Sequence, residues 1–303
     1  MSEGGAAGRA WLARLPAELD AQRRLMSWLI DFCEATPEAS ELVVGCSVGR
    51  GAADALSDID GAVGVTAEPG EAGAAQVQAV EALLAAALTE PRWPGAVPLV
   101  DMLRHRYGPA DRFIRRIFAQ FADGAQLDLT VMSDAELGQR GARPDFLSLY
   151  AEGSPPVSGT RDQAFAVSGE QVREWTFLGW CALIDADKYL RRGSLWEAHH
   201  RVNDARHHIW QLWAASTGAM YPWHGMTQVL DNDPHDLPPG IEATVAGLDV
   251  TALRQASIAS AALLSSVSES AAKLWPAELP QAMAHYVTSV LSGGSRDGRD
   301  ATP

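Results

Sequence analysis

The stretch VVGCSVGRGAADALSDIDGAVGV, residues 43–65, joins an apolar run, a turn with three glycines and two closely spaced acids. Asp58 and Asp60 flank Ile59 where a second apolar run begins. The pattern predicts two short strands joined by a glycine-rich connection. Because side chains at i and i+2 of a strand share a face, we expect the two carboxylates side by side and Ile59 on the opposite face.

Two neighbouring carboxylates repel each other, so burying them without a counter-charge is unfavourable. A bound divalent cation offsets this repulsion. Mg²⁺ takes hard oxygen ligands and leaves room for waters and phosphate oxygens. Asp128 lies between apolar residues in QLDLTVM, residues 126–132, which reads as another strand. An inward-facing acid there would complete a three-carboxylate metal site, suited to in-line displacement at phosphorus.

The turn after the first strand has the composition of a phosphate cradle. Ser47 directly follows the strand end, and small residues after it let backbone N–H groups approach a phosphate closely. Ser47, Gly49 and Arg50 are the predicted nucleotide contacts in this turn. The first predicted metal ligand, Asp58, follows Ser47 by eleven residues.

Three other motifs with glycines or acids fit the stretch less well. A Walker loop requires Gly-Lys-Ser/Thr after four spacer residues, and the chain has none. A dinucleotide fingerprint requires a third glycine where Ala53 and Asp54 stand, and its acid comes later in the chain. An EF-hand loop ends in Glu, whereas this segment ends in Val65. Acids on a solvated strand edge would not explain why the glycines, the serine and a third strand acid occur together.

The segment CSVGRGAADALSDID, residues 46–60, resembles the signature of the DNA-polymerase-β-type nucleotidyltransferase superfamily, in the version found in minimal and antibiotic nucleotidyltransferases. The resemblance implies ATP or another NTP as donor, Mg²⁺, and transfer of a nucleoside monophosphate to a hydroxyl. It implies that Ser47 contacts the terminal phosphates. Asp58 and Asp60 would hold metal, with Asp128 as the third carboxylate.

One position departs from the family pattern. The glycine that usually precedes the serine is replaced by Cys46, and Gly45 stands one position earlier. We expect a side chain at this point to crowd the phosphates or to shift the turn.

The predicted fold class is α+β, with two domains. Residues 1–145 read as a mixed-sheet nucleotidyltransferase domain after a frayed first dozen residues, and residues 165–292 read as a helical bundle on the acceptor side. An Asp-Gly turn between two apolar runs predicts a hairpin over residues 112–132. The Gly-, Pro- and Ser-rich residues 138–163 read as a linker or ordered loop, and residues 293–303 as a disordered tail. We expect the active site between the two domains.

The helical half offers further polar candidates. Lys188 is the predicted triphosphate contact, since related enzymes often supply an acid and a lysine from this domain. The general base is left open between Asp128 and three acids of the helical half, Glu174, Asp185 and Asp187.

Two more features of this half could line the site. His200, Asp204 and His208 are spaced to share a helix face, which suits a polar surface better than a zinc site without further ligands. YPWHG, residues 221–225, is an aromatic turn that could stack on a base or a sugar.

The bulk composition bounds the function class. The chain has 303 residues, of which 47% are apolar and 20% charged, as in globular proteins. No apolar run is long enough to predict a membrane span or a secretion signal, and the three cysteines are scattered, so we predict a cytoplasmic protein. We expect a monomer or a homodimer.

The net charge of -14 argues against a nucleic-acid partner and favours a cationic small substrate. The predicted reaction is therefore Mg²⁺-dependent transfer of AMP from ATP to a small hydroxylated molecule such as an aminoglycoside-like antibiotic, which implies a role in antibiotic resistance. Two alternatives stay open: an antitoxin-type nucleotidyltransferase acting on protein or RNA, and a non-catalytic nucleotide-binding protein with this fold.

Overall fold

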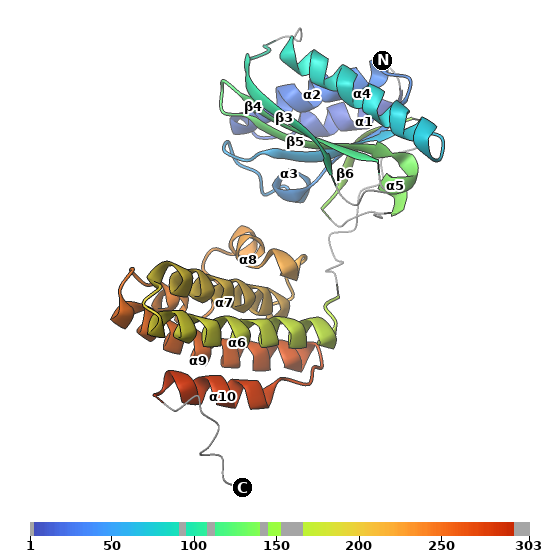
Figure 1. Ribbon diagram of the computed structural model, residues 1–303. Coiled ribbons are helices and arrows are strands. Elements are labelled where there is room, and N and C mark those ends of the chain that lie inside the picture. The colour runs from blue at the N-terminus through green and yellow to red at the C-terminus, as the bar shows by residue number, and fades with distance from the viewer. Residues whose placement is uncertain (1–2, 91–94, 108–112, 140–144, 153–165, 294–303) are drawn as a thin grey trace. The chain divides into compact units, whose positions relative to one another are not determined.

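The computed structural model describes residues 3–90, 95–107, 113–139, 145–152 and 166–293. It consists of two compact units, residues 1–162 and 163–303 (Figure 1). The described strands lie in the first unit, and the second unit is built of helices. The fold class is thus α+β, as the sequence predicts. The predicted disordered tail falls outside the described residues, apart from Gly293.

A six-stranded mixed sheet forms the first unit, with strand order β3-β4-β5-β2-β1-β6. Neighbouring strands are antiparallel except β2 and β5, which are parallel. The strand bounds are β1 (Ala39–Val44), β2 (Ile59–Val65), β3 (Leu99–Tyr107), β4 (Ile114–Phe121), β5 (Gln126–Ser133) and β6 (Leu147–Ala151).

Helices cover the two faces of this sheet unequally. One face carries α1 (Glu3–Leu12), α2 (Asp20–Ala35) and α4 (Glu71–Thr89), and the short helices α3 (Cys46–Arg50) and α5 (Asp134–Gln139) lie on the other (Figure 1). Ile59, Leu127 and Leu129 are buried in the core beneath the long helices. Because side chains alternate along a strand, Asp60 and Asp128 face away from that core. We call this second side the open face.

Two elements differ from the sequence prediction. Residues 3–12 are not frayed, because they form α1, which packs against β6. Gly8 lies so close to that strand that an added Cβ would lie 2.0 Å from the carbonyl oxygen of Leu149. The predicted first-domain boundary at 145 is too early, since β6 follows it and pairs with β1. The pairing partner lies about a hundred residues earlier, so the local Gly- and Pro-rich composition did not reveal this strand.

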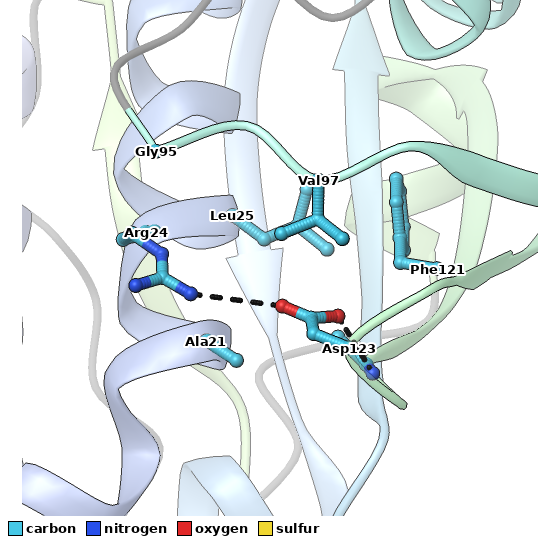
Figure 2. Close-up of a pocket in the computed structure, with 8 residues that line it drawn as sticks. Ala21, Arg24, Leu25, Gly95, Val97, Phe121 and Asp123 are labelled. Carbon is cyan, nitrogen blue, oxygen red and sulfur yellow. Dashed lines mark hydrogen bonds and ion pairs between the residues drawn. The ribbon is translucent and has the colours of Figure 1, made fainter.

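The predicted hairpin is confirmed as β4 and β5. Its Asp-Gly turn is fixed from both sides, as Figure 2 shows: Asp123 accepts a hydrogen bond from the backbone N–H of Ala125 at 3.1 Å and pairs with Arg24 of α2 at 3.6 Å. The hollow between them has a volume of only about 10 Å³, too small for an organic ligand. The ion pair therefore fastens the turn to α2.

Helix α4 is long and apolar enough to cross a bilayer by length and composition. It packs on the sheet instead through Val77, Val80 and Leu84, all buried. It also carries Glu81, whose side chain is fully buried and accepts two hydrogen bonds of 2.7 Å from Arg104 of β3. We therefore interpret α4 as a core helix.

The second unit is a helical bundle. Its helices are α6 (Gly169–Arg191), α7 (Leu195–Ser216), α8 (Met226–Asn232), α9 (Val250–Leu274) and α10 (Gln281–Leu291), with short 3₁₀ turns η2 (Pro222–His224) and η3 (Ile241–Thr244). The closest packing is among α6, α7 and α9. Trp175, Trp180 and Trp210 belong to the core, whereas Trp196 is 75% exposed.

We predict that Glu81→Ala lowers the free energy of unfolding of the first unit by about 2–4 kcal/mol, because two guanidinium groups, Arg104 and Arg115, lose a buried partner. Urea unfolding followed by circular dichroism measures this change. Glu71→Ala, at an exposed position in the first turn of the same helix, is the control and should stay within about 1 kcal/mol. Equal unfolding midpoints for the two variants would contradict the assigned role of Glu81.

Candidate active site

Sheet register brings the predicted acids together on the open face. Asp60 on β2 lies directly opposite Asp128 on the parallel strand β5, and Asp58 comes just before β2. The row continues across the sheet to Phe118 on β4 and Leu103 on β3. The three predicted metal ligands thus lie on neighbouring segments, where β2 and β5 begin.

The charges of these acids act on one another. Burial first, and then the neighbouring carboxylates of Asp58 and Asp128, raise the pKa of Asp60 from its ordinary 3.8 to about 6. The thiol of Cys46, through a hydrogen bond, and the guanidinium of Arg116 lower it. The causes that raise the pKa outweigh those that lower it, so the ionised carboxylate of Asp60 is unfavourable here. A bound cation would stabilise it.

Arg116 is a site residue that the sequence analysis missed. Its Nε donates to Oδ1 of Asp128 at 2.6 Å, and its Nη2 donates to Oδ2 of the same carboxylate. Its Cζ lies 4.3 Å from the centre of the Phe118 ring, which it covers. The sequence could have predicted this contact. Counting residues outward from the hairpin turn places Arg116 on the same strand face as Phe118 and diagonally across from Asp128.

The donor set fits a hard divalent cation, with one qualification for Asp128. Among the described residues, no three His, Cys, Asp or Glu side chains are already gathered as a metal-binding group. Both oxygens of Asp128 are engaged by Arg116, which leaves Asp58 and Asp60 as the pair facing a cation. One or two carboxylates with waters and phosphate oxygens suffice for Mg²⁺. Asp128 as a third metal ligand stays a prediction and requires Arg116 to release it.

The turn that carries Ser47 is fixed by the chain segment before β6. The backbone N–H of Gly45 donates to the carbonyl oxygen of Asp60 at 2.9 Å, which ties the turn to β2. The backbone N–H of Cys46 donates at 3.2 Å to the carboxylate of Asp145, which is 2% exposed. Asp145 lies in the stretch that the sequence analysis took for a linker, so its role was missed.

Two of the predicted nucleotide contacts have packing roles in this turn. A Cβ added to Gly49 would lie 1.7 Å from the carbonyl oxygen of Asp145, so only glycine fits there. Arg50 extends to the carboxylate of Asp145 at 3.5 Å and is 13% exposed. Ser47 is half-buried, and its hydroxyl makes no hydrogen bond to another described residue. Ser47 as a phosphate contact stays a prediction.

Cys46, which replaces the usual glycine, has an uncommon backbone conformation, and its thiol contacts an acid of the site. Cys46 has a φ of 52°, a left-handed conformation that favours glycine. Its thiol makes a hydrogen bond with Asp60, and burial raises the pKa of the thiol well above its usual range. Its side chain therefore turns toward the acids, whereas the sequence analysis expected it to crowd the phosphates or shift the turn.

Lys188, the remaining predicted nucleotide contact, belongs to the second unit. Its Nζ pairs with Asp185 at 2.5 Å and lies 4.7 Å from the centre of the Tyr189 ring. Asp187 is 1% exposed and accepts a hydrogen bond of 2.7 Å from Arg191, which gives it a structural role. Lys188 as a triphosphate contact stays a prediction.

The polar face of α7 lines a cavity. His208 Nδ1 lies 2.9 Å from Gln211 Oε1, and burial lowers the pKa of His208. Asp204 binds Arg201 at 2.7 Å, and His200 is 67% exposed. Asp204 and His208 line a cavity of about 220 Å³ between α6 and α7. In the YPWHG turn, Tyr221 is buried and Trp223 is 38% exposed.

No protein-family model matches the chain, and no curated protein matches it. The structure resembles an aminoglycoside 6-adenyltransferase from Bacillus subtilis at 15% identity and a TM-score of 0.40, over 92% of this chain and 98% of that one. It also resembles a nucleotidyltransferase-like protein from Exiguobacterium sibiricum at 14% identity and a TM-score of 0.36, over 84% of this chain and 78% of the other. Because both TM-scores lie below 0.5, neither likeness bears on what this chain acts on.

We predict that Asp60→Asn stabilises the metal-free protein at pH 7, by up to about 3 kcal/mol. Because the folded-state pKa of about 6 exceeds the ordinary 3.8, the folded state holds this proton more tightly, and stability falls as pH rises from about 4 to about 6. The neutral amide of Asn removes this loss of stability. Calorimetric melting of both proteins in EDTA at pH 4 and pH 7 measures the stability difference between variant and wild type. Asp101→Asn, at an exposed acid of the same face, is the control; an Asp60→Asn gain that is equal at both pH values would refute the explanation.

We predict that Cys46→Gly is more stable than Cys46→Ala by about 1 kcal/mol, because only glycine adopts the left-handed conformation without strain. At Ser47, inside the short helix, the order should reverse, with Ser47→Ala above Ser47→Gly. Thermal unfolding of the four variants tests both orders. If alanine is the better residue at both positions, the left-handed turn is not present in solution.

Proposed function

We propose that the first unit is the catalytic domain of a Mg²⁺-dependent nucleotidyltransferase that moves a nucleoside monophosphate, AMP from ATP, to a hydroxyl of a small molecule. The observation that carries the proposal is the in-register placement of Asp60 opposite Asp128 on parallel strands, with Asp58 beside them. The turn with Ser47 is hydrogen-bonded to the same strand through the Asp60 carbonyl. The proposed metal ligands and the proposed phosphate contact are therefore adjacent.

In this proposal, the chain's residues position the donor and the acceptor. Ser47 and the neighbouring backbone N–H groups bind the terminal phosphates, and Asp58 and Asp60 hold Mg²⁺. When bound, Mg²⁺ neutralises the acids and the triphosphate and stabilises charge during in-line displacement. The acceptor oxygen bonds to the α-phosphorus, the bond from phosphorus to the bridging oxygen breaks, and pyrophosphate leaves.

A base must remove the proton of the acceptor hydroxyl. We propose Asp128, because the Arg116 guanidinium holds its carboxylate, whereas no guanidinium contact is shown for Asp58 or Asp60 in the described residues, and these two acids would face the cation. Release of one oxygen from Arg116 would expose a lone pair to the hydroxyl. Arg116 would remain beside Asp60, where its charge opposes the accumulation of negative charge.

A non-catalytic nucleotide-binding role is the second candidate. The Arg116–Asp128 pair favours it, since a permanently paired Asp128 can serve neither as metal ligand nor as base. We propose that this pair opens when donor and cation bind. We further propose a small-molecule acceptor, for which the net charge of -14 is the supporting observation. We also propose a cytoplasmic enzyme, for which the three free cysteines are the supporting observation.

We predict that a non-hydrolysable ATP analogue binds in Mg²⁺ and binds at least tenfold more weakly in EDTA. Asp60→Asn should weaken the Mg²⁺-dependent binding to the same degree, because the cation loses a ligand. Glu71→Gln, at an exposed acid of α4 on the covered side of the sheet, is the control and should bind like the wild type. Isothermal titration calorimetry gives these affinities.

The same variants separate catalysis from binding. With α-labelled ATP and a panel of hydroxylated small molecules, the wild type should form a labelled product, and Asp58→Asn and Asp60→Asn should form none. Nucleotide affinity that is indifferent to EDTA and to Asp60→Asn would exclude the proposed site.

A further inference from the structure

A cavity of about 380 Å³ opens on the face of the sheet beyond the acids. Asp58 and Asp128 stand at its edge. Its floor is apolar, formed by Leu103 and Phe118, which are 60% and 37% exposed. Large apolar side chains on an open sheet face beside a charged centre indicate a surface that binds a ligand with an apolar part.

Sheet register builds this cavity as two adjoining rows. One row runs from Leu103 through Phe118 to Asp128. The second row, two residues along each strand, consists of Asp101, Gln120 and Gln126. The amide of Gln126 donates to Gln120 Oε1 at 2.7 Å, and the amide of Gln120 donates to the carbonyl oxygen of Phe121 at 3.0 Å. The polar row is thus held in place beside the apolar floor.

The Phe118 ring is itself held in position. The guanidinium of Arg116 covers it at 4.3 Å, and the His105 ring lies parallel to it at 6.2 Å. Arg116 also binds Asp128. One side chain therefore connects the apolar floor to the proposed base.

The strand order indicates on which side of the reacting phosphorus the cavity lies. The turn with Ser47 follows β1, and β1 pairs with the edge of β2 that is opposite β5. If Ser47 holds the leaving pyrophosphate, in-line attack must come from the other side of the phosphorus, which is the side of β5 and β4. The cavity lies on that side.

We propose that this cavity binds the acceptor, and that the acceptor is an amphipathic hydroxylated molecule whose apolar ring or chain lies on Phe118 and Leu103. This inference rests on the proposed function and deepens it. The acceptor hydroxyl points toward Asp128, which takes its proton as the oxygen bonds to the α-phosphorus of ATP and pyrophosphate leaves. Polar groups of the acceptor face Gln120, Gln126 and Asp101. A polycation without an apolar surface would leave the floor uncovered.

The test uses two probes that differ only in apolar length, octyl β-glucoside below its micellar concentration and methyl β-glucoside. Methyl resonances of Leu103, assigned by Leu103→Val, report binding at the cavity itself. We expect saturable shifts with the octyl probe and none with the methyl probe. Phe118→Ala should weaken octyl-probe binding about fivefold to tenfold, because part of the apolar contact is lost. Leu83→Ala, at an exposed leucine on the opposite side of the sheet, is the control and should change nothing.

Adding the Mg²⁺ complex of the non-hydrolysable ATP analogue distinguishes the possible occupants. Simultaneous binding of nucleotide and octyl probe supports the acceptor site. Displacement of the probe by nucleotide overturns the proposal, since the floor would then bind the donor base. Absence of saturable Leu103 shifts also overturns it. Neither result touches the proposed function, which fails only if Mg²⁺-dependent nucleotide binding is insensitive to Asp60→Asn.

Discussion

Repulsion among three carboxylates is the constraint on which the first unit depends. Parallel pairing of β2 with β5 sets Asp60 opposite Asp128, and Asp58 adds a third charge next to them. The guanidinium of Arg116 is the positive group shown to act on Asp60, and two of its nitrogens, Nε and Nη2, donate to Asp128. An arrangement of this kind is unfavourable for folding alone, and it is most simply explained as preparation for a cation and a triphosphate.

The remainder of the sheet compensates for that arrangement. On the covered face, the same strands place Ile59, Leu127 and Leu129 in a closely packed core. Asp145 holds the turn through the backbone N–H of Cys46, the residue next to the proposed phosphate contact Ser47. The open face keeps exposed apolar residues that a purely structural sheet would cover. One face of the sheet is thus packed for stability, and the proposed site lies on the other.

Local sequence patterns predicted the parts of this site that depend on local geometry. Strand alternation placed Asp58 and Asp60 on one face, and the Asp-Gly turn placed β4 against β5. The strand β6 was missed because its partner is distant in sequence. Asp145 was missed with it, and Gly49 was assigned to phosphate although its packing against Asp145 requires glycine. Predicting the contact between Arg116 and Asp128 requires the residue-by-residue register of the hairpin, not only its presence. The left-handed φ of Cys46 had no local signal beyond the missing glycine.

A structure of the protein with Mg²⁺ and a non-hydrolysable ATP analogue tests the central claim most directly. The account predicts a cation at about 2.1 Å from carboxylate oxygens of both Asp58 and Asp60. It also predicts the terminal phosphates at the Ser47 turn and the α-phosphate between that turn and Asp128. Nucleotide bound elsewhere, or bound here while the carboxylates of Asp58 and Asp60 contact no cation, would contradict it.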